Sequence, residues 1–129
     1  PVAEEMQLGA SIGLAMSGYV PISIYPRWNF LLLAFNQLIN HLDKLSEIAK
    51  GGYSAKVIIR TAIGSEYPLN PQHQHVGDFT DGVRAMCKNI SVVRLERPEE
   101  IFRTYEEAYE REDNVPSLIV EHGDYLNKK

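Results

Sequence analysis

Residues 55–63 read AKVIIRTAI, a run in which apolar residues follow one another without the polar–apolar alternation of a half-exposed strand. The runs VPISIY (20–25), SVVRL (91–95) and PSLIVE (116–121) have the same character. Short continuous apolar runs are typical of strands that are buried on both faces of a parallel sheet. We therefore expect these segments to form a mostly parallel sheet.

Helical patterns separate these strands along the chain. The clearest follows the first strand, and its apolar residues recur at spacings of four and three: Leu31, Phe35, Leu38, Leu42 and Leu45. Further helices are expected over 3–19, over 78–88 with Asp78 as its cap, and from Pro98 onward. The alternation predicts an α/β fold with three layers, in which a mostly parallel sheet carries helices on both faces.

The composition excludes several classes of protein. The 129 residues suffice for one domain, and the net charge of -4 argues against a nucleic-acid surface, which is normally basic. The single cysteine, Cys87, excludes an internal disulfide, and the longest apolar run, FLLLAF (30–35), is too short for a membrane span. Because PVAEEM has neither an initiator Met nor the pattern of a signal peptide, we expect a cytoplasmic protein and a partial chain.

Two candidate sites follow strands, at the edge of a parallel sheet where ligands gather. NPQHQHVGDF (70–79) carries His73 and His75 in a loop, and PRWNF (26–30) places aromatic residues at a strand end. A metal site needs three or four ligands, and no cysteine or His-Glu pair stands near the histidines at ligand spacing. We expect no metal site in this chain, and the aromatic segment is either core or a flat wall for a planar ligand.

The order of these features is similar to that of a known family. PVAEEM, GASIGLAMSGYVPISIYPRWNF, KVIIRTAIG, QHQHVGDF and SVVRLERPEE, in this order and spacing, resemble the pyrimidine-binding domain of transketolase-like thiamine-diphosphate enzymes. The resemblance is closest to the beta subunits of 2-oxoacid dehydrogenases and covers residues 1–121, with 122–129 as a tail. It implies the thiamine-diphosphate-binding fold without the first strand and helix of the family's domain.

The resemblance assigns a role in proton transfer to Glu4. In the family, the carboxyl at this position hydrogen-bonds a ring nitrogen of the cofactor's aminopyrimidine and favours its imino tautomer. Such a carboxyl must share a proton near neutral pH, so its burial must outweigh the effect of the helix dipole on its pKa. Glu5 is the alternative, because helical periodicity does not separate the two. Acidic residues in a first turn also have an ordinary role, which is to favour the helix dipole.

The resemblance also implies a cofactor wall and a loop residue. The aromatic side chain that stacks on the pyrimidine falls on Phe30, an apolar contact to the same ring falls on Pro26, and Trp28 is a further cofactor-binding candidate. The family's loop histidine falls on His75, with His73 as the alternative. A histidine there can donate a proton or hydrogen bond to the developing oxyanion of the substrate.

The implied function is that of half an enzyme, a dehydrogenase of the 2-oxoacid beta type or a transferase of the transketolase type. In the family, a GDG element in another domain holds the metal, and GDG does not occur here. We expect thiamine diphosphate and Mg²⁺ as cofactors, with Mg²⁺ bound by a diphosphate-binding domain or alpha-type subunit in a homo- or hetero-oligomer. The expected reaction is C–C cleavage next to the carbonyl of a 2-oxo acid or ketose sugar, and the chain alone is expected to be inactive.

Two rival interpretations stay open. The chain is a noncatalytic module of the same fold that serves assembly or regulation, or it is an unrelated flavodoxin-like binding domain. In the second rival the aromatic residues are core, the histidines are solvated, and Glu4, Phe30 and His75 lie far apart.

Overall fold

A computed structural model describes residues 2–67 and 69–126 of the chain. Within them, a sheet of parallel strands has the order β1-β2-β4-β3. The strands are β1 (Ile22–Ile24), β2 (Ile58–Ile63), β3 (Ser91–Arg94) and β4 (Ser117–His122). The four apolar runs therefore become the four strands, and β2 and β4, each paired on both sides, form the centre of the sheet.

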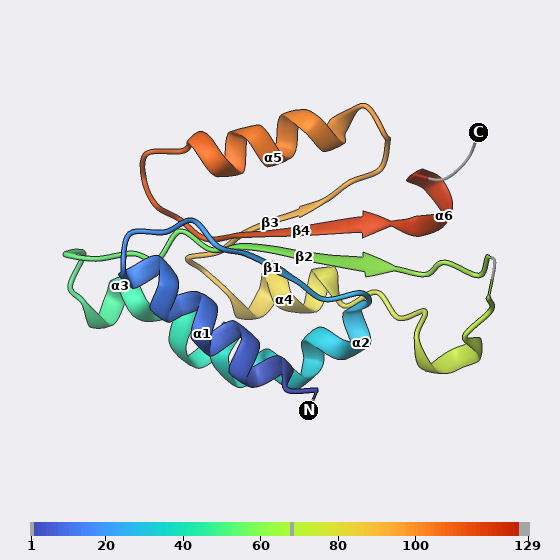
Figure 1. Cartoon of the computed structure of the whole chain (residues 1–129), viewed down its shortest axis with the longest axis horizontal. Coiled ribbons are helices and arrows are strands. Elements are labelled where there is room, and N and C mark those ends of the chain that lie inside the picture. The colour runs from blue at the N-terminus through green and yellow to red at the C-terminus, as the bar shows by residue number, and fades with distance from the viewer. Residues whose placement is uncertain (1, 68, 127–129) are drawn as a thin grey trace.

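Helices cover both faces of this sheet (Figure 1). One face carries α5 (Glu100–Glu110), and the other carries α1 (Glu4–Met16), α4 (Thr80–Met86) and a long helical segment, residues 28–48. That segment is made of α2 (Trp28–Leu31), the 3₁₀ helix η1 (Leu32–Ala34), the π helix η2 (Asn36–Leu42) and α3 (Leu45–Ile48). The short turns are η3 (Gln72–Gln74) and α6 (Gly123–Leu126). The prediction of a three-layer α/β fold is confirmed.

The two apolar layers are unequal in size. The larger layer joins the sheet to α1, α4 and the long helical segment, and its buried side chains include Leu8, Ile12, Trp28, Leu31, Leu38, Ile59, Val83, Leu118 and Val120. The smaller layer lies under α5 and contains Ile58, Leu95, Ala108 and Ile119. Because burial of apolar surface is the main stabilising contribution, the larger layer fixes α1 and the start of α2 against the sheet.

The long helical segment buries its apolar stripe, but its backbone is not uniform. Residues 36–42 form π turns, which end at Asp43. The carboxylate of Asp43 is fully buried, and its Oδ1 accepts the main-chain N–H groups of Lys88 and Asn89, both at 2.8 Å. The hydrophobic pattern predicts a continuous helix, and it does not indicate either the π turns or this contact between residues 45 positions apart.

Two elements end or begin close to where the sequence predicts. Helix α1 ends at Met16, and Gly18 follows with a φ of 89°, a left-handed conformation that favours glycine. Asp78 lies two residues before α4, and its Oδ1 accepts the N–H of Thr80 at 2.9 Å. The helix thus begins two residues later than expected and its N-cap residue is Phe79, so the prediction of Asp78 as the cap is wrong, although Asp78 does bind the first turn of the helix.

The expectation that Pro98 begins the next helix is wrong. Helix α5 begins at Glu100, and the carboxylate of Glu100 accepts the main-chain N–H groups of Glu96 and Arg97. These bonds hold residues 96–99 as a turn before the helix.

The expected tail, 122–129, begins inside β4, because His122 is the last residue of that strand. Residues 127–129 lie outside the described residues. The division at residue 121 stays a prediction.

Cys87 provides a direct test of core burial. Its side chain is 7% exposed, and burial, with a smaller effect from Asp43, raises the pKa of its thiol to about 11. A free cysteine has a pKa near 8.5, and only the thiolate reacts. At pH 8 we expect iodoacetamide to alkylate the native chain more than about a hundredfold more slowly than the urea-unfolded chain. Mass spectrometry of both reactions measures this, and similar rates would contradict the buried position.

Candidate functional site

The candidate site lies at the carboxyl ends of β1 and β2. The start of α1, the turn after β1 and the loop 64–77 after β2 come together there (Figure 1). The arrowheads of the strands, α2 and this loop lie at one edge of the molecule. This edge is where ligands are bound in open parallel sheets.

A pocket of about 380 Å³ occupies this edge, and we call it the Glu4 pocket. It is lined by Val2, Ala3, Glu4, Met6, Gln7, Ile24, Tyr25, Pro26 and Phe30. Three residues predicted to bind a cofactor, Glu4, Pro26 and Phe30, therefore share one pocket. The flavodoxin-like interpretation expected Glu4, Phe30 and His75 far apart, whereas Glu4 and Phe30 line one pocket and the ring of His75 stacks on Phe30.

The main chain of Glu4 is bound by Tyr25, the residue that follows β1, in a short chain of hydrogen bonds. The residue is 8% exposed, and the hydroxyl of Tyr25 donates to its main-chain carbonyl at 3.2 Å. Ser23 donates to the Tyr25 oxygen at 3.4 Å, and the Nε2 of Gln7 donates to Ser23 at 3.0 Å. Burial raises the pKa of Tyr25, the Ser23 bond lowers it, and the nearby Glu4 carboxylate raises it further. The first turn of α1 is thus fixed to the end of the strand.

Glu5 has a different environment from Glu4. Its side chain is exposed, and its Oε1 accepts hydrogen bonds from Asn36 at 3.0 Å and Gln37 at 3.4 Å. These two bonds hold the pKa of Glu5 below its usual value. Both glutamates border a second hollow of about 730 Å³ between α1 and the long helical segment, but Glu5 does not line the Glu4 pocket. The geometry therefore favours Glu4 as the candidate acid.

The aromatic segment divides between the pocket and the core. Phe30 is half-buried and lines the pocket, and Pro26 beside it is exposed. Trp28 is 0% exposed, and its ring meets Phe79 edge-on with centroids 6.1 Å apart. Trp28 therefore packs beneath the wall and offers no surface to a ligand, because it is the residue of this segment that faces the sheet. The buried position of Trp28 does not support the predicted direct contact between this residue and a cofactor.

The two histidines of the loop lie in different surroundings. The ring of His75 stacks on Phe30, with centroids 5.1 Å apart and an interplanar angle of 14°. His75 is half-buried, and its Nδ1 is buried without a hydrogen-bond partner in the described part of the chain. His73 is exposed and lies in η3. The structure thus brings His75 to the predicted wall and leaves His73 at the surface.

Arg27 is a site residue that the sequence does not predict. Its guanidinium donates to the main-chain carbonyls of Ser65 and His75, at 3.2 and 2.9 Å. These partners are main-chain atoms 38 and 48 residues away, so no motif or spacing signals the contact.

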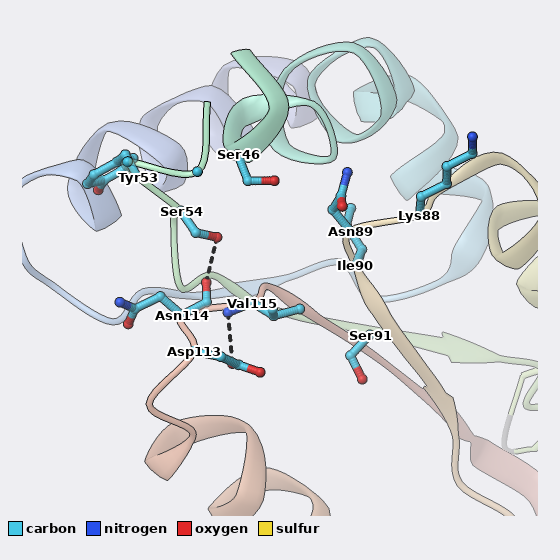
Figure 2. A pocket seen from close by; sticks show the side chains of 12 residues that line it. Ser46, Tyr53, Ser54, Lys88, Asn89, Ile90, Ser91, Asp113, Asn114 and Val115 are labelled. Carbon is cyan, nitrogen blue, oxygen red and sulfur yellow. Dashed lines mark hydrogen bonds between the residues drawn. The ribbon is translucent and has the colours of Figure 1, made fainter. Parts of the chain in front are cut away.

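Another pocket contains no comparable group of candidate catalytic side chains among the described residues. Figure 2 shows this pocket, of about 530 Å³, at the opposite edge of the sheet, where β3 and β4 begin. Its Asp113 already accepts hydrogen bonds from Arg111 and from the N–H of Val115. Among residues 2–67 and 69–126, no three His, Cys, Asp or Glu side chains gather as metal ligands. Within the same ranges, no helix has the length and hydropathy to cross a membrane.

The sequence matches a family profile described as the pyrimidine-binding domain of transketolase, over residues 1–128. The beta subunits of the pyruvate dehydrogenase E1 component from Mesostigma viride and Cyanidium caldarium are 36% and 38% identical to it over 73 residues. Each alignment covers 57% of this chain and 22% of the relative. The same subunit from Leifsonia xyli is 28% identical over 115 residues, which are 89% of this chain and 33% of the relative.

The chain thus spans a third or less of the length of these curated relatives. The resemblance drawn from the order of motifs is confirmed, while the binding roles of Glu4, Pro26, Trp28, Phe30 and His75 stay predictions. Since the profile covers nearly the whole sequence and the sheet and helices have the matching architecture, the chain belongs to the family of transketolase pyrimidine-binding domains.

Proposed function

We propose that this chain is the pyrimidine-binding half of a thiamine-diphosphate-dependent enzyme that acts on 2-oxo acids. One observation carries the proposal. Glu4 and Phe30, 26 positions apart in the sequence, line the same pocket at the ligand-binding edge of the sheet. The pyruvate dehydrogenase beta subunits among the relatives favour the dehydrogenase type over the transketolase type.

The residues of the Glu4 pocket fit the pyrimidine of the cofactor. The carboxyl of Glu4 is nearly buried at a pocket of about 380 Å³, where it can share a proton with a ring nitrogen. Phe30 and Pro26 provide apolar surface that suits a flat ring and excludes water. When bound, thiamine diphosphate supplies the carbon nucleophile for cleavage of the bond next to the substrate carbonyl.

His75 is the candidate group for proton transfer to the substrate. It lies beside Phe30, and its buried Nδ1 has no hydrogen-bond partner among the described residues. An imidazole can hold and donate a proton near neutral pH. In this proposal His75 donates to the developing oxyanion of the substrate, and stacking on Phe30 sets the direction of the ring.

The proposal requires a partner. A diphosphate-binding domain or alpha-type subunit binds the diphosphate through Mg²⁺ and completes the site, so the chain alone has no turnover. The relatives are named as subunits of a component, which supports an oligomer. A cytoplasmic location is part of the same proposal.

A titration of thiamine diphosphate into the complex of this chain with its diphosphate-binding partner tests the proposal. We expect Phe30→Ala to weaken binding by about tenfold, because stacking of aromatic rings contributes about 0.5–1.5 kcal/mol beyond the burial of area. Calorimetry or quenching of protein fluorescence measures the Kd.

Phe102→Ala is the matched control, since Phe102 is 75% exposed on α5 at the far face of the sheet. We expect it to leave the Kd within twofold. A wild-type complex that binds no thiamine diphosphate would instead indicate a noncatalytic assembly or regulatory module and would overturn the proposal.

A further inference from the structure

Arg27 joins the two sides of the candidate site through its side chain and its main chain. It lies between β1 and α2 and is half-buried. Its Nη1 donates to the carbonyl of His75 at 2.9 Å, and its Nη2 donates to the carbonyl of Ser65 at 3.2 Å. Ser65 and His75 stand near the beginning and the end of the loop 64–77. One guanidinium therefore holds both ends of this loop.

The main chain of Arg27 holds the other partner of the stack. Its carbonyl accepts the N–H of Phe30 at 3.0 Å, which fixes the first turn of α2. The rings of His75 and Phe30 then meet nearly parallel, with centroids 5.1 Å apart. The main chains of His75 and Phe30, whose rings form this stack, are thus both hydrogen-bonded to Arg27.

The charge of Arg27 is used differently from that of other arginines. It forms no ion pair with a carboxylate in residues 2–67 and 69–126, whereas six arginines in these ranges do: Arg60, Arg84, Arg94, Arg97, Arg103 and Arg111. Hydrogen bonds from a charged donor are stronger than neutral ones. A planar guanidinium also presents two donors in a fixed fork, which a lysine ammonium cannot reproduce. The two side-chain hydrogen bonds of Arg27 thus both go to main-chain carbonyls of the loop.

We propose that Arg27 is a positioning residue that holds the histidine loop so that the imidazole of His75 stays against Phe30 at the edge of the Glu4 pocket. The inference rests on the proposed function, and it adds a residue that sets the position of the candidate proton donor. Loss of the Arg27 side chain removes its bond to the carbonyl of His75 and displaces that residue. Because Arg27 does not line the Glu4 pocket, its loss leaves the pyrimidine contacts of Glu4 and Phe30 in place.

NMR of the four histidines of the 129-residue chain tests the first part without any cofactor. An imidazole stacked on a benzene ring has its C–H signals shifted upfield by the ring current. His75→Gln assigns the signal of His75, and Phe30→Leu shows its position when the stack is lost. We expect Arg27→Gln to move the His75 signal to the position seen in Phe30→Leu.

Arg103→Gln is the matched control, because Arg103 is 81% exposed on α5 and pairs only with Glu107 in the described part of the chain. We expect it to leave the His75 signal unchanged. An unchanged signal in Arg27→Gln would overturn the proposal. If Arg27→Gln does not fold, Arg27→Lys decides, because one ammonium cannot span both carbonyls. A His75 signal shifted part of the way then supports the proposal, and an unshifted one overturns it.

The complex with the diphosphate-binding partner tests the second part. We expect Arg27→Gln to lower kcat by about ten- to a hundredfold, since a displaced catalytic group loses orientation. The Kd for thiamine diphosphate should stay within twofold. A raised Kd with unchanged kcat would overturn the positioning role. Failure of the wild-type complex to bind thiamine diphosphate would sink the proposed function, while the NMR result still decides whether Arg27 orders His75.

Discussion

Glu4→Gln is expected to remove most thiamine-dependent turnover of the complex with its diphosphate-binding partner, a loss of about 10²–10⁴-fold in kcat. Glutamine keeps the volume and one hydrogen-bonding oxygen of the side chain, but it cannot hold and return a proton as a carboxyl does. Glu4 is 8% exposed and lines the pocket with Phe30 and Pro26, where no other carboxyl group stands among the lining residues. Steady-state kinetics of the two complexes measures the effect, and unchanged activity would refute the role of Glu4.

Glu5→Gln is the control for this experiment. Glu5 lies in the same helical turn and has the same chemistry, but its carboxylate is exposed and is bound by Asn36 and Gln37. We expect its replacement to leave kcat within about twofold, because it removes no group from the Glu4 pocket. If Glu5→Gln causes the larger loss, the assignment of the two glutamates must be exchanged.

Asp43→Ala is expected to lower the free energy of unfolding by about 3 kcal/mol. The buried carboxylate accepts the N–H groups of Lys88 and Asn89, and its removal leaves these two partly buried donors without that partner, at about 1–3 kcal/mol each. Its Oδ2 also lies 2.9 Å from the ammonium of Lys44. Urea unfolding at pH 7 measures the loss. Asp81→Ala on α4 is the control, because the Asp81 side chain is 85% exposed, and it should cost less than about 0.5 kcal/mol.

The pH dependence of this difference follows from the pKa of Asp43. Burial raises that pKa, but the N–H donors of Asn89 and Lys88 and the ammonium of Lys44 together outweigh it and hold the pKa below its usual value. An unfolded aspartate takes up a proton near pH 3.9, before the folded one does. The stabilisation is therefore fully present above about pH 5 and is lost as the pH falls through the lower pKa of the folded state. The difference between wild type and Asp43→Ala should be constant from pH 8 to 5 and shrink below about pH 4.

Much of the fold follows from local pattern. The continuous apolar runs predict the four strands because a strand buried on both faces leaves no position for a polar alternation. The stripe from Leu31 to Leu45 predicts the long helical segment, since its spacing of four and three keeps one face apolar. The same pattern misses the π turns of residues 36–42, because apolar spacings of four and three do not distinguish them from α-helical turns.

The sequence by itself predicted the sheet, because strands and helices depend on the pattern of neighbouring residues. The resemblance in the order of motifs gave the family and the candidates Glu4, Pro26 and Phe30. The resemblance favoured Glu4 over Glu5 and His75 over His73. Only the tertiary structure showed that the members of each pair have different surroundings, since these depend on contacts with distant residues. It also placed Trp28 in the core and gave Arg27 its partners. These outcomes depend on which segments the packed core brings together, and residues 38 and 48 positions apart meet only after the chain has folded.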